Sequence, residues 1–224
     1  MAFIDVSGLN KSYRVGDQHI HVLRNLELRV AHGEMVAIVG ASGVGKSTLL
    51  HLLGGLDRAD SGTIHLADTD LAALDDTALV QFRNRNVGFV FQFHHLLSEF
   101  DAAENVEMPM RIARRPKADA RRRATELLTR VALGDRVAHR PSMMSGGEQQ
   151  RVAVARALAM NPAVLLADEP TGDLDERTAD ALHDLLRSMH AESGLTSVIA
   201  THNPRLAAAC DRVLRMEQGQ LNPA

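Results

Sequence analysis

The feature that most constrains the fold of this chain is a glycine-rich segment, GASGVGKS, which begins at Gly40. It follows a short apolar run, Met35–Val39, and precedes an apolar stretch with helical character, Lys46–Leu53. This is the pattern GxxxxGK[ST] in the context it requires, after a strand and at the start of a helix. Glycines let successive backbone N–H groups turn inward around a phosphate chain, and the helix N-terminus adds partial positive charge. The segment therefore predicts a phosphate-binding loop.

Two side chains of this loop have distinct expected roles. Lys46 is placed to reach the β- and γ-phosphates of a nucleotide, and the Ser47 hydroxyl is placed to hold Mg²⁺. A glycine-rich turn that binds nothing is the alternative, and the flanking strand and helix disfavour it. The residues of this segment predicted to contact ATP are Gly40, Ala41, Ser42, Gly43, Val44, Gly45, Lys46, Ser47 and Thr48.

A second motif ends in two adjacent acids. Residues 163–167 form an apolar run, and Asp168 and Glu169 follow it. A strand with this ending places its acids at the carboxyl edge of a parallel sheet, where such folds bind ligands. Asp168 is expected in the Mg²⁺ shell, and Glu169 is expected to polarise the attacking water as general base. A surface Asp-Glu pair at a helix start is the alternative, which the phosphate loop upstream disfavours.

The rest of the chain predicts an α/β fold. Residues 197–200 form another apolar strand, and residues 176–190 have the apolar spacing of a helix. Buried strands that alternate with helices indicate a mainly parallel sheet covered on both faces. The first thirty residues instead predict antiparallel strands with a turn at residues 15–17.

We expect one domain over residues 1–224. Its nucleotide-binding core, with an N-terminal antiparallel β subdomain, is expected at about residues 1–92 and 160–224. Residues 93–159 interrupt the parallel pattern and predict an inserted helical subdomain. Residues 220–224 are expected to form a loose tail.

Composition excludes several classes of protein. The apolar share of 45% and the charged share of 24% are typical of a globular domain. A net charge of −3 gives no general preference for nucleic acid or anionic lipid. Cys210 has no second cysteine to pair with, which favours a reducing compartment and a buried free thiol. The sequence shows neither a membrane span nor a signal peptide, so we expect contact with a membrane only through other chains.

A second phosphate-seeking helix start is predicted where the segment Ser145-Gly-Gly-Glu opens another helix. One nucleotide needs only one such cradle, so a dimer is expected in which Ser145 and Gly147 close over the ATP of the opposite chain. Here Met144-Ser-Gly-Gly-Glu148 resembles LSGGQ, the signature of the ABC (ATP-binding cassette) ATPase family. Residues 145–148 are therefore expected to contact ATP, namely Ser145, Gly146, Gly147 and Glu148.

That resemblance assigns roles to four further residues. It implies that Tyr13 stacks on adenine and that Gln92 senses Mg²⁺ and the attacking water. It implies that Asp175 is the acidic member of the loop that communicates across the dimer, and that His202 contacts the γ-phosphate. Without the other motifs, a tyrosine near a strand or a histidine at a strand end would more often be an ordinary packing residue than a ligand contact.

The family resemblance covers almost the whole chain. It implies a P-loop NTPase fold with a RecA-like core, ATP and Mg²⁺ as cofactors, ATP hydrolysis, a homodimer, and a membrane permease partner. The expected catalytic residues are Lys46, Gln92, Glu169 and His202. The expected Mg²⁺ ligands are Ser47, Gln92 and Asp168.

Two segments narrow the resemblance. Residues 49–57 and 91–100 resemble the ATPases of bacterial lipoprotein-releasing systems, as do Glu104-Asn-Val106 and Met108-Pro109. This implies permeases of the LolC/LolE type and a place on the cytoplasmic face of the inner membrane. Ser98 stands where proline is expected, and Asp173 where asparagine is usual. The alternatives are a macrolide-export or FtsE-like cell-division ATPase, and a soluble ABC protein of DNA repair or translation, which tandem cassettes or zinc modules would mark.

Two further segments have open roles. His94 and His95 are interpreted as a docking surface for a cytoplasmic helix of the permease, with packing as the alternative; no ligand set supports a metal. Residues 111–123 carry seven basic side chains against one acid, Asp119. A solvated helix face is expected there, with contact to lipid headgroups as the alternative. Nucleic acid is disfavoured because no aromatic residues interleave.

Overall fold

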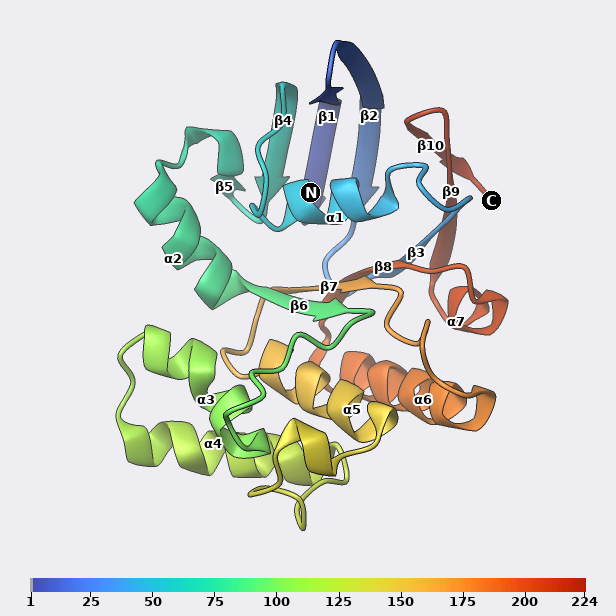
Figure 1. The fold of residues 1–224 in the computed structure, drawn as a ribbon. Helices are drawn as coiled ribbons and strands as arrows, with labels where there is room; N and C mark the ends of the chain where they lie inside the picture. The colour runs from blue at the N-terminus through green and yellow to red at the C-terminus, as the bar shows by residue number, and fades with distance from the viewer. Residues whose placement is uncertain (1) are drawn as a thin grey trace.

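Two β-sheets organise the computed structural model, which describes residues 2–224 (Figure 1). The antiparallel sheet has the order β2-β1-β4-β5. Its strands are β1 (Ile4–Val15), β2 (Gln18–Val30), β4 (Ser61–Leu66) and β5 (Thr69–Asp70). Strands β1 and β2 form the predicted hairpin, in which Tyr13 lies directly opposite Ile20.

The second sheet has the order β10-β9-β3-β8-β7-β6, and all its pairings are parallel except that of β10 with β9. The three central strands are buried along nearly their whole length, as expected for a sheet covered on both faces. The strands are β3 (Met35–Val39), β6 (Val87–Phe91), β7 (Val164–Asp168), β8 (Thr196–Ala200), β9 (Arg212–Glu217) and β10 (Gln220–Pro223).

Helices cover both faces of this sheet. Helix α1 (Lys46–Leu53) packs between the two sheets, and four of its leucines are buried there. A separate apolar core lies on the opposite face and joins α5 (Gly146–Ala157) and α6 (Glu176–Ser193) to α3 (Ala102–Ile112) and α4 (Lys117–Arg130). The other helices are α2 (Asp76–Asn86) and the short α7 (Pro204–Ala208), with 3₁₀ turns at Leu71–Ala73 and Pro141–Met143.

The mainly parallel α/β core is confirmed. Helices α3, α4 and α5 fall within residues 93–159, although the subdomain boundaries stay a prediction. Helix α2 was not expected from the sequence, because its apolar face is narrow and only Leu79 is buried. No helix within residues 2–224 combines the length and apolar character needed to span a bilayer.

The expectation of a loose tail is wrong. Residues 220–223 form β10, which pairs antiparallel with β9 from Gln220–Glu217 onward. The turn between them uses two residues with positive φ, Gln218 (51°) and Gly219 (80°), as two-residue hairpin loops require. The carbonyl of Gly219 also accepts a hydrogen bond from the N–H of Arg24 at 3.0 Å. The tail is thus anchored both to its own hairpin and to β2.

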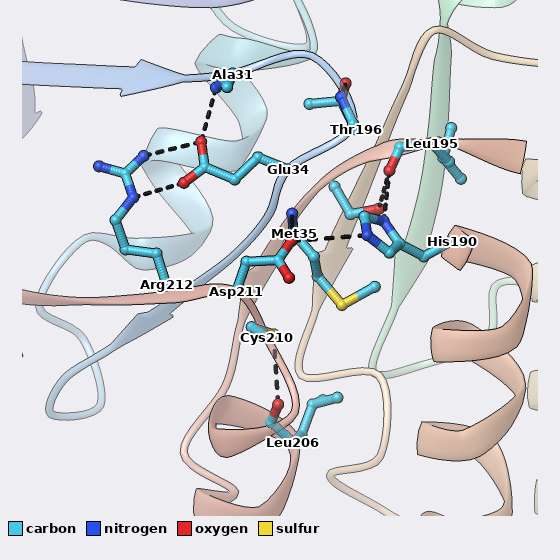
Figure 2. A network of polar contacts seen from close by, with 12 residues as sticks. Ala31, Glu34, Met35, His190, Leu195, Thr196, Leu206, Cys210, Asp211 and Arg212 are labelled. Atoms are coloured by element: carbon cyan, nitrogen blue, oxygen red, sulfur yellow. Dashed lines mark hydrogen bonds and ion pairs between the residues drawn. The ribbon is translucent and has the colours of Figure 1, made fainter.

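Polar contacts fix the amino ends of the parallel strands (Figure 2). The carboxylate of Glu34 accepts hydrogen bonds from the N–H of Ala31 and from the guanidinium of Arg212, each at 2.7 Å. Asp211 accepts a hydrogen bond from the N–H of Met35 at 2.8 Å. These contacts join β3 to β9 at the edge opposite the predicted phosphate loop.

The thiol of Cys210 belongs to the same region. It donates to the carbonyl of Leu206 at 3.4 Å. Burial raises the pKa of Cys210 to about 12, so the thiol is protonated at neutral pH and is a poor nucleophile.

The basic run at residues 111–123 is mostly exposed, but it also neutralises a buried acid. Glu107 on α3 is fully buried. Its Oε1 lies 2.7 Å from Nε of Arg121 on α4, and its Oε2 lies 3.7 Å from Nη1 of Arg111. The ion pair therefore connects α3 to α4.

We predict that Glu107→Ala lowers the free energy of unfolding by about 1–3 kcal/mol. Removing one partner of a fully buried ion pair lowers the free energy of unfolding by more than this. Here the two arginines are partly exposed, so the expected loss is smaller. Urea denaturation measures the change. Arg121→Ala should cost more than Arg111→Ala because its contact is closer. A Glu107→Ala variant with wild-type stability would contradict the assignment.

Candidate active site

Four neighbouring parallel strands end at one edge of the sheet, and a predicted site residue follows each of them. In the order β3, β8, β7, β6, these are the phosphate loop, His202, the pair Asp168–Glu169, and Gln92. The register aligns the strand ends, since Ala200 pairs with both Ile38 and Asp168, and Asp168 pairs with Phe91. The structure therefore brings these predicted residues to one edge.

The phosphate loop, residues 40–47, needs its glycines. Gly40, Gly43 and Gly45 have φ values of 154°, 76° and 114°. A Cβ on Gly40 would also lie 2.7 Å from the carbonyl oxygen of Met216, and one on Gly45 would lie 2.8 Å from Val22 Cγ1. Backbone conformation therefore disfavours any side chain at all three glycines, and lack of space excludes even a methyl group at Gly40 and Gly45.

The charge of this loop comes from Lys46 and from the start of α1. The buried ammonium of Lys46 donates to the carbonyls of Gly40 at 2.9 Å and Ala41 at 3.0 Å. Within residues 2–224, no side chain caps the N-terminus of α1. Its first N–H groups are therefore available to an anionic ligand.

A carboxylate and an imidazole meet beside this loop. Oε2 of Glu169 lies 2.8 Å from Nδ1 of His202 and accepts a hydrogen bond from the backbone N–H of His202 at 3.1 Å. Glu169 has a φ of 46°, a conformation that a glutamate adopts only when its surroundings impose it. Its own N–H donates to the carbonyl of Ala200 at 2.9 Å. The carboxylate is thereby fixed at the edge of the sheet, and the histidine remains 70% exposed.

Gln92 contacts the loop that follows Glu169. Its Nε2 donates to Oδ1 of Asp173 at 2.9 Å, and a Cβ on Gly172 would lie 3.0 Å from its amide. With Nε2 engaged, Oε1 is the acceptor of this side chain. Asp173, where the family resemblance led us to expect asparagine, therefore provides a carboxylate acceptor for Gln92.

Gln150, on α5, supports the same edge and was missed by the sequence analysis. Its buried Nε2 donates to the carbonyls of Phe91 at 3.0 Å and Pro170 at 2.8 Å. It thus joins the ends of β6 and β7. The only signal in the sequence is its position on the apolar face of the helix that Ser145 opens.

The segment predicted to close over the partner's nucleotide starts α5. Ser145 is its N-cap, and Ser145 and Glu148 form a capping box: the Ser145 hydroxyl accepts from the N–H of Glu148, and the Glu148 carboxylate accepts from the N–H of Ser145 at 2.8 Å. That N–H holds the pKa of Glu148 below its usual value. Because α5 packs on the face of the sheet opposite α1, the two phosphate-seeking helix starts of one chain lie on different faces.

The start of α5 is in close contact with the start of α6. A Cβ on Gly147 would lie 2.2 Å from Cγ2 of Thr178. Thr178 in turn donates through its hydroxyl and its N–H to Asp175, the N-cap of α6, at 2.6 and 3.1 Å. Asp175 therefore caps a helix, whatever further contact it makes.

The residues expected to hold Mg²⁺ have suitable donors. The hydroxyl of Ser47, the carboxylate of Asp168 and Oε1 of Gln92 are hard oxygen ligands, which Mg²⁺ prefers. They stand on α1, β7 and the segment after β6, at the shared carboxyl edge. The chemistry of the set fits the ion.

Tyr13 is an exposed aromatic residue on β1, opposite the strand that passes the phosphate loop. Its ring is 38% exposed, beside Ile20, which is 47% exposed and was also missed. Two residues further along β2, Val22 lies next to the phosphate loop, where a Cβ added to Gly45 would meet its Cγ1. Two strand residues span about 7 Å, a length comparable with that of a ribose.

Comparison with known proteins adds to this geometry. Residues 23–172 match the family described as ABC transporter. The chain belongs to the ABC transporter family. As an ABC ATPase it binds ATP and hydrolyses it.

Its relatives match over nearly their full length. It is 50% identical over 220 residues to the "Lipoprotein-releasing system ATP-binding protein LolD" of Geobacter metallireducens, covering 98% of each chain. The protein of that name from Pseudomonas syringae pv. tomato is 52% identical, with 98% of this chain and 97% of the relative covered. That of Myxococcus xanthus is 49% identical over the whole of both chains.

Solved ABC structures have the same fold. A dimeric ATP-binding cassette in a post-hydrolysis state, bound to ADP and Pi, superposes with a TM-score of 0.91 at 37% identity, covering 98% of this chain and 96% of that one. The ABC ATPase fold, with its antiparallel and mainly parallel sheets, is thereby confirmed.

We predict that Gly147→Ala destabilises this ATPase by about 1–3 kcal/mol because the added methyl group overlaps Thr178. Gly146→Ala is the matched control, since its Cβ would meet only Leu174 Cδ2, at 3.9 Å. The control should keep or raise the free energy of unfolding by up to about 1 kcal/mol, since alanine favours a helix.

Thr178→Ser removes the methyl group that meets the new Cβ and keeps the hydroxyl that bonds Asp175. The double variant Gly147→Ala/Thr178→Ser should therefore recover most of the lost stability in urea denaturation. Equal stabilities of the two single glycine variants would refute the close contact.

Proposed function

We propose that this ABC ATPase is the ATP-hydrolysing subunit of a bacterial lipoprotein-releasing system. The observation that carries the proposal is the 49–52% identity, over nearly complete chains, to relatives of that name in three bacteria. In this role the chain acts on the cytoplasmic face of the inner membrane, as a peripheral subunit beneath a permease of the LolC/LolE type. Hydrolysis powers the release of lipoproteins from that membrane for delivery to the outer membrane.

Glu169 acts as the general base in this proposal. Its position beside His202 and its fixed backbone support the role, because a general base has to be held within reach of the attacking water. His202 contacts the γ-phosphate through its exposed ring. Lys46 carries positive charge to the β- and γ-phosphates, and the glycine N–H groups of residues 40–47 bind the phosphate oxygens.

Ser47, Asp168 and Gln92 would hold Mg²⁺, which would supply positive charge to neutralise the phosphates. Gln92 also orients the water. Because Gln92 bonds Asp173, this orientation depends on the position of residues 172–175, the loop we propose to communicate across the dimer.

A homodimer completes two ATP sites. The Ser145 hydroxyl accepts from the N–H of Glu148, so its own hydrogen is available as a donor to a phosphate of the opposite chain's ATP. Gly146, Gly147 and Glu148 form the helix start that faces this nucleotide, and Asp175 acts in the loop between the chains. The dimeric cassette with ADP and Pi supports this arrangement by its similarity.

An apolar groove near Gln92 is the proposed site for a cytoplasmic helix of the permease. Phe89 and Phe91 stack in parallel at its floor, with ring centroids 5.4 Å apart. Its rim is apolar and exposed, with Val80 at 48% and Ile112 at 61%. An exposed apolar rim of this kind is typical of a surface that a partner covers.

His94 and His95 are positioned beside this groove by their backbones. The guanidinium of Arg156, which lines the groove, donates to both of their carbonyls at 2.7 Å. Burial lowers the pKa of His94, so its ring is neutral at neutral pH.

The proposal is tested by tagging the chain in its own cells, solubilising the membranes gently and identifying the membrane protein that co-purifies. A LolC/LolE-type permease supports it, and ATP-dependent release of a lipoprotein by the reconstituted complex would complete the test. A macrolide-export or division-type permease would overturn the cargo while leaving the ATPase assignment. The absence of any membrane partner would overturn the transport role.

We predict that Glu169→Gln retains ATP binding, traps the ATP-bound dimer and lowers turnover at least about 100-fold, because it removes the general base. Phosphate release measures turnover, calorimetry measures binding, and size-exclusion chromatography measures the dimer. Glu126→Gln, on the exposed face of α4, is the matched control and should turn over normally. Wild-type turnover in Glu169→Gln would remove Glu169 from its role.

A further inference from the structure

Residues 49–57 narrowed the family resemblance in the sequence analysis, but the proposed function assigns no role to them. The last residue of the segment, Asp57, lies beside the predicted adenine-stacking residue. The Tyr13 hydroxyl donates to Oδ2 of Asp57 at 2.8 Å. Oδ1 of the same carboxylate accepts from Nζ of Lys11 at 2.9 Å and from the N–H of Arg58 at 2.7 Å. Both oxygens of Asp57 are therefore engaged.

Lys11 completes the cluster. Only 8% of this lysine is exposed, and its ammonium also donates to the carbonyl of Arg58 at 2.7 Å. The ammonium lies over the ring of Tyr13, 5.0 Å from its centroid, in the range of a cation–π interaction. One face of the ring is thus occupied by the ammonium, while the tyrosine as a whole is 38% exposed. We call Lys11, Tyr13 and Asp57 the tyrosine clamp.

The clamp is attached to the phosphate-binding helix. The backbone N–H of Asp57 donates to the carbonyl of His51, in the last turn of α1, at 3.4 Å, and Leu56 donates to the same oxygen at 2.8 Å. Tyr13 belongs to β1, in the antiparallel sheet. The contact between the Tyr13 hydroxyl and the Asp57 carboxylate therefore fixes the tyrosine ring relative to α1. The first turn of α1 belongs to the phosphate loop.

The electrostatics agree with a fixed neutral phenol. Burial alone would raise the pKa of Asp57, but the hydrogen bonds from Lys11, Tyr13 and the N–H of Arg58, with the charge of Lys11, together lower it overall. The pKa of Tyr13 is raised, first by burial and then by the carboxylate of Asp57. The pair therefore persists as carboxylate and phenol through the neutral range and into alkaline solution.

We propose that Lys11 and Asp57 are positioning residues for nucleotide recognition: they hold the Tyr13 ring at a set distance and angle from the phosphate loop, so that an adenine can stack on the face opposite the ammonium. The proposal rests on the stacking role of Tyr13 in the proposed function. By this proposal, the tighter binding of a nucleoside triphosphate than of inorganic triphosphate depends on Lys11, Tyr13 and Asp57 together rather than on Tyr13 alone.

The test compares two ligands in calorimetry on the full chain: the non-hydrolysable analogue AMPPNP, which carries the base, and inorganic triphosphate, which does not. Asp57→Ala, which removes the acceptor, and Tyr13→Phe, which removes only the donor, should each weaken AMPPNP binding about 5- to 20-fold, because each removes a support of the ring without deleting the ring, and complete loss of base–aromatic stacking costs about 5- to 150-fold. Neither should change triphosphate binding. The double variant should bind AMPPNP no more weakly than Asp57→Ala does, since the two single variants remove the same hydroxyl–carboxylate contact.

Asp60→Asn is the matched control. Asp60 lies in the same loop, and its carboxylate accepts from the N–H and the hydroxyl of Ser12 at 2.7 and 2.6 Å, with no bond to the tyrosine. This variant should bind AMPPNP as the wild type does.

Tyr13→Ala separates the two proposals. If it weakens AMPPNP binding while Asp57→Ala and Tyr13→Phe do not, the clamp is refuted and the stacking role stands. If Tyr13→Ala binds AMPPNP normally, both fail. Equal weakening of both ligands in Asp57→Ala would overturn the clamp, because the loss would then lie in the phosphate loop.

A spectroscopic measurement gives a second readout. The chain has one tyrosine and no tryptophan, so phenolate absorbance in the native protein reports Tyr13 alone. Asp57→Ala should shift the ionisation of Tyr13 to lower pH, because it removes the neighbouring negative charge. An unchanged titration in Asp57→Ala would overturn the clamp.

Discussion

The pairing register of β3, β8, β7 and β6 is the constraint on which the rest of the site depends. Each strand is short and buried, so its hydrogen bonds to its neighbours leave no freedom to slide. The loops that leave the four strands therefore start side by side. Residues that are far apart in the sequence, such as Lys46 and Glu169, owe their common edge to this register rather than to direct contact.

Much of this arrangement could be predicted because its signals are local. Residues 35–47 combine an apolar run, glycines at turn positions and a helix start, and the structure has β3 and α1 at the predicted bounds. The β1–β2 hairpin and the Ser145 helix were equally visible. In each case a few consecutive residues determine the backbone, and no distant partner is needed.

The parts that were missed or wrong depend on distant partners or on faint local signals. The role of Asp57 requires a tyrosine 44 residues earlier in the chain, and Gln150 requires two strand ends that only the folded sheet brings together. Spacing along the chain carries no trace of such contacts. The prediction of a loose tail was wrong for another reason. The strand β10 is short and polar, and only the Gln218–Gly219 turn indicates the hairpin.

The close approach of Gly147 to Thr178 has a mechanical consequence. The first turns of α5 and α6 touch so closely that a methyl group does not fit between them. A displacement of the start of one helix is therefore expected to displace the start of the other. Thr178 is bonded to Asp175, and the same short loop carries Asp173, which holds Gln92. A shift of the α5 start would therefore reach, through Thr178 and the loop of Asp173 and Asp175, the glutamine proposed to orient water in the chain's own nucleotide site.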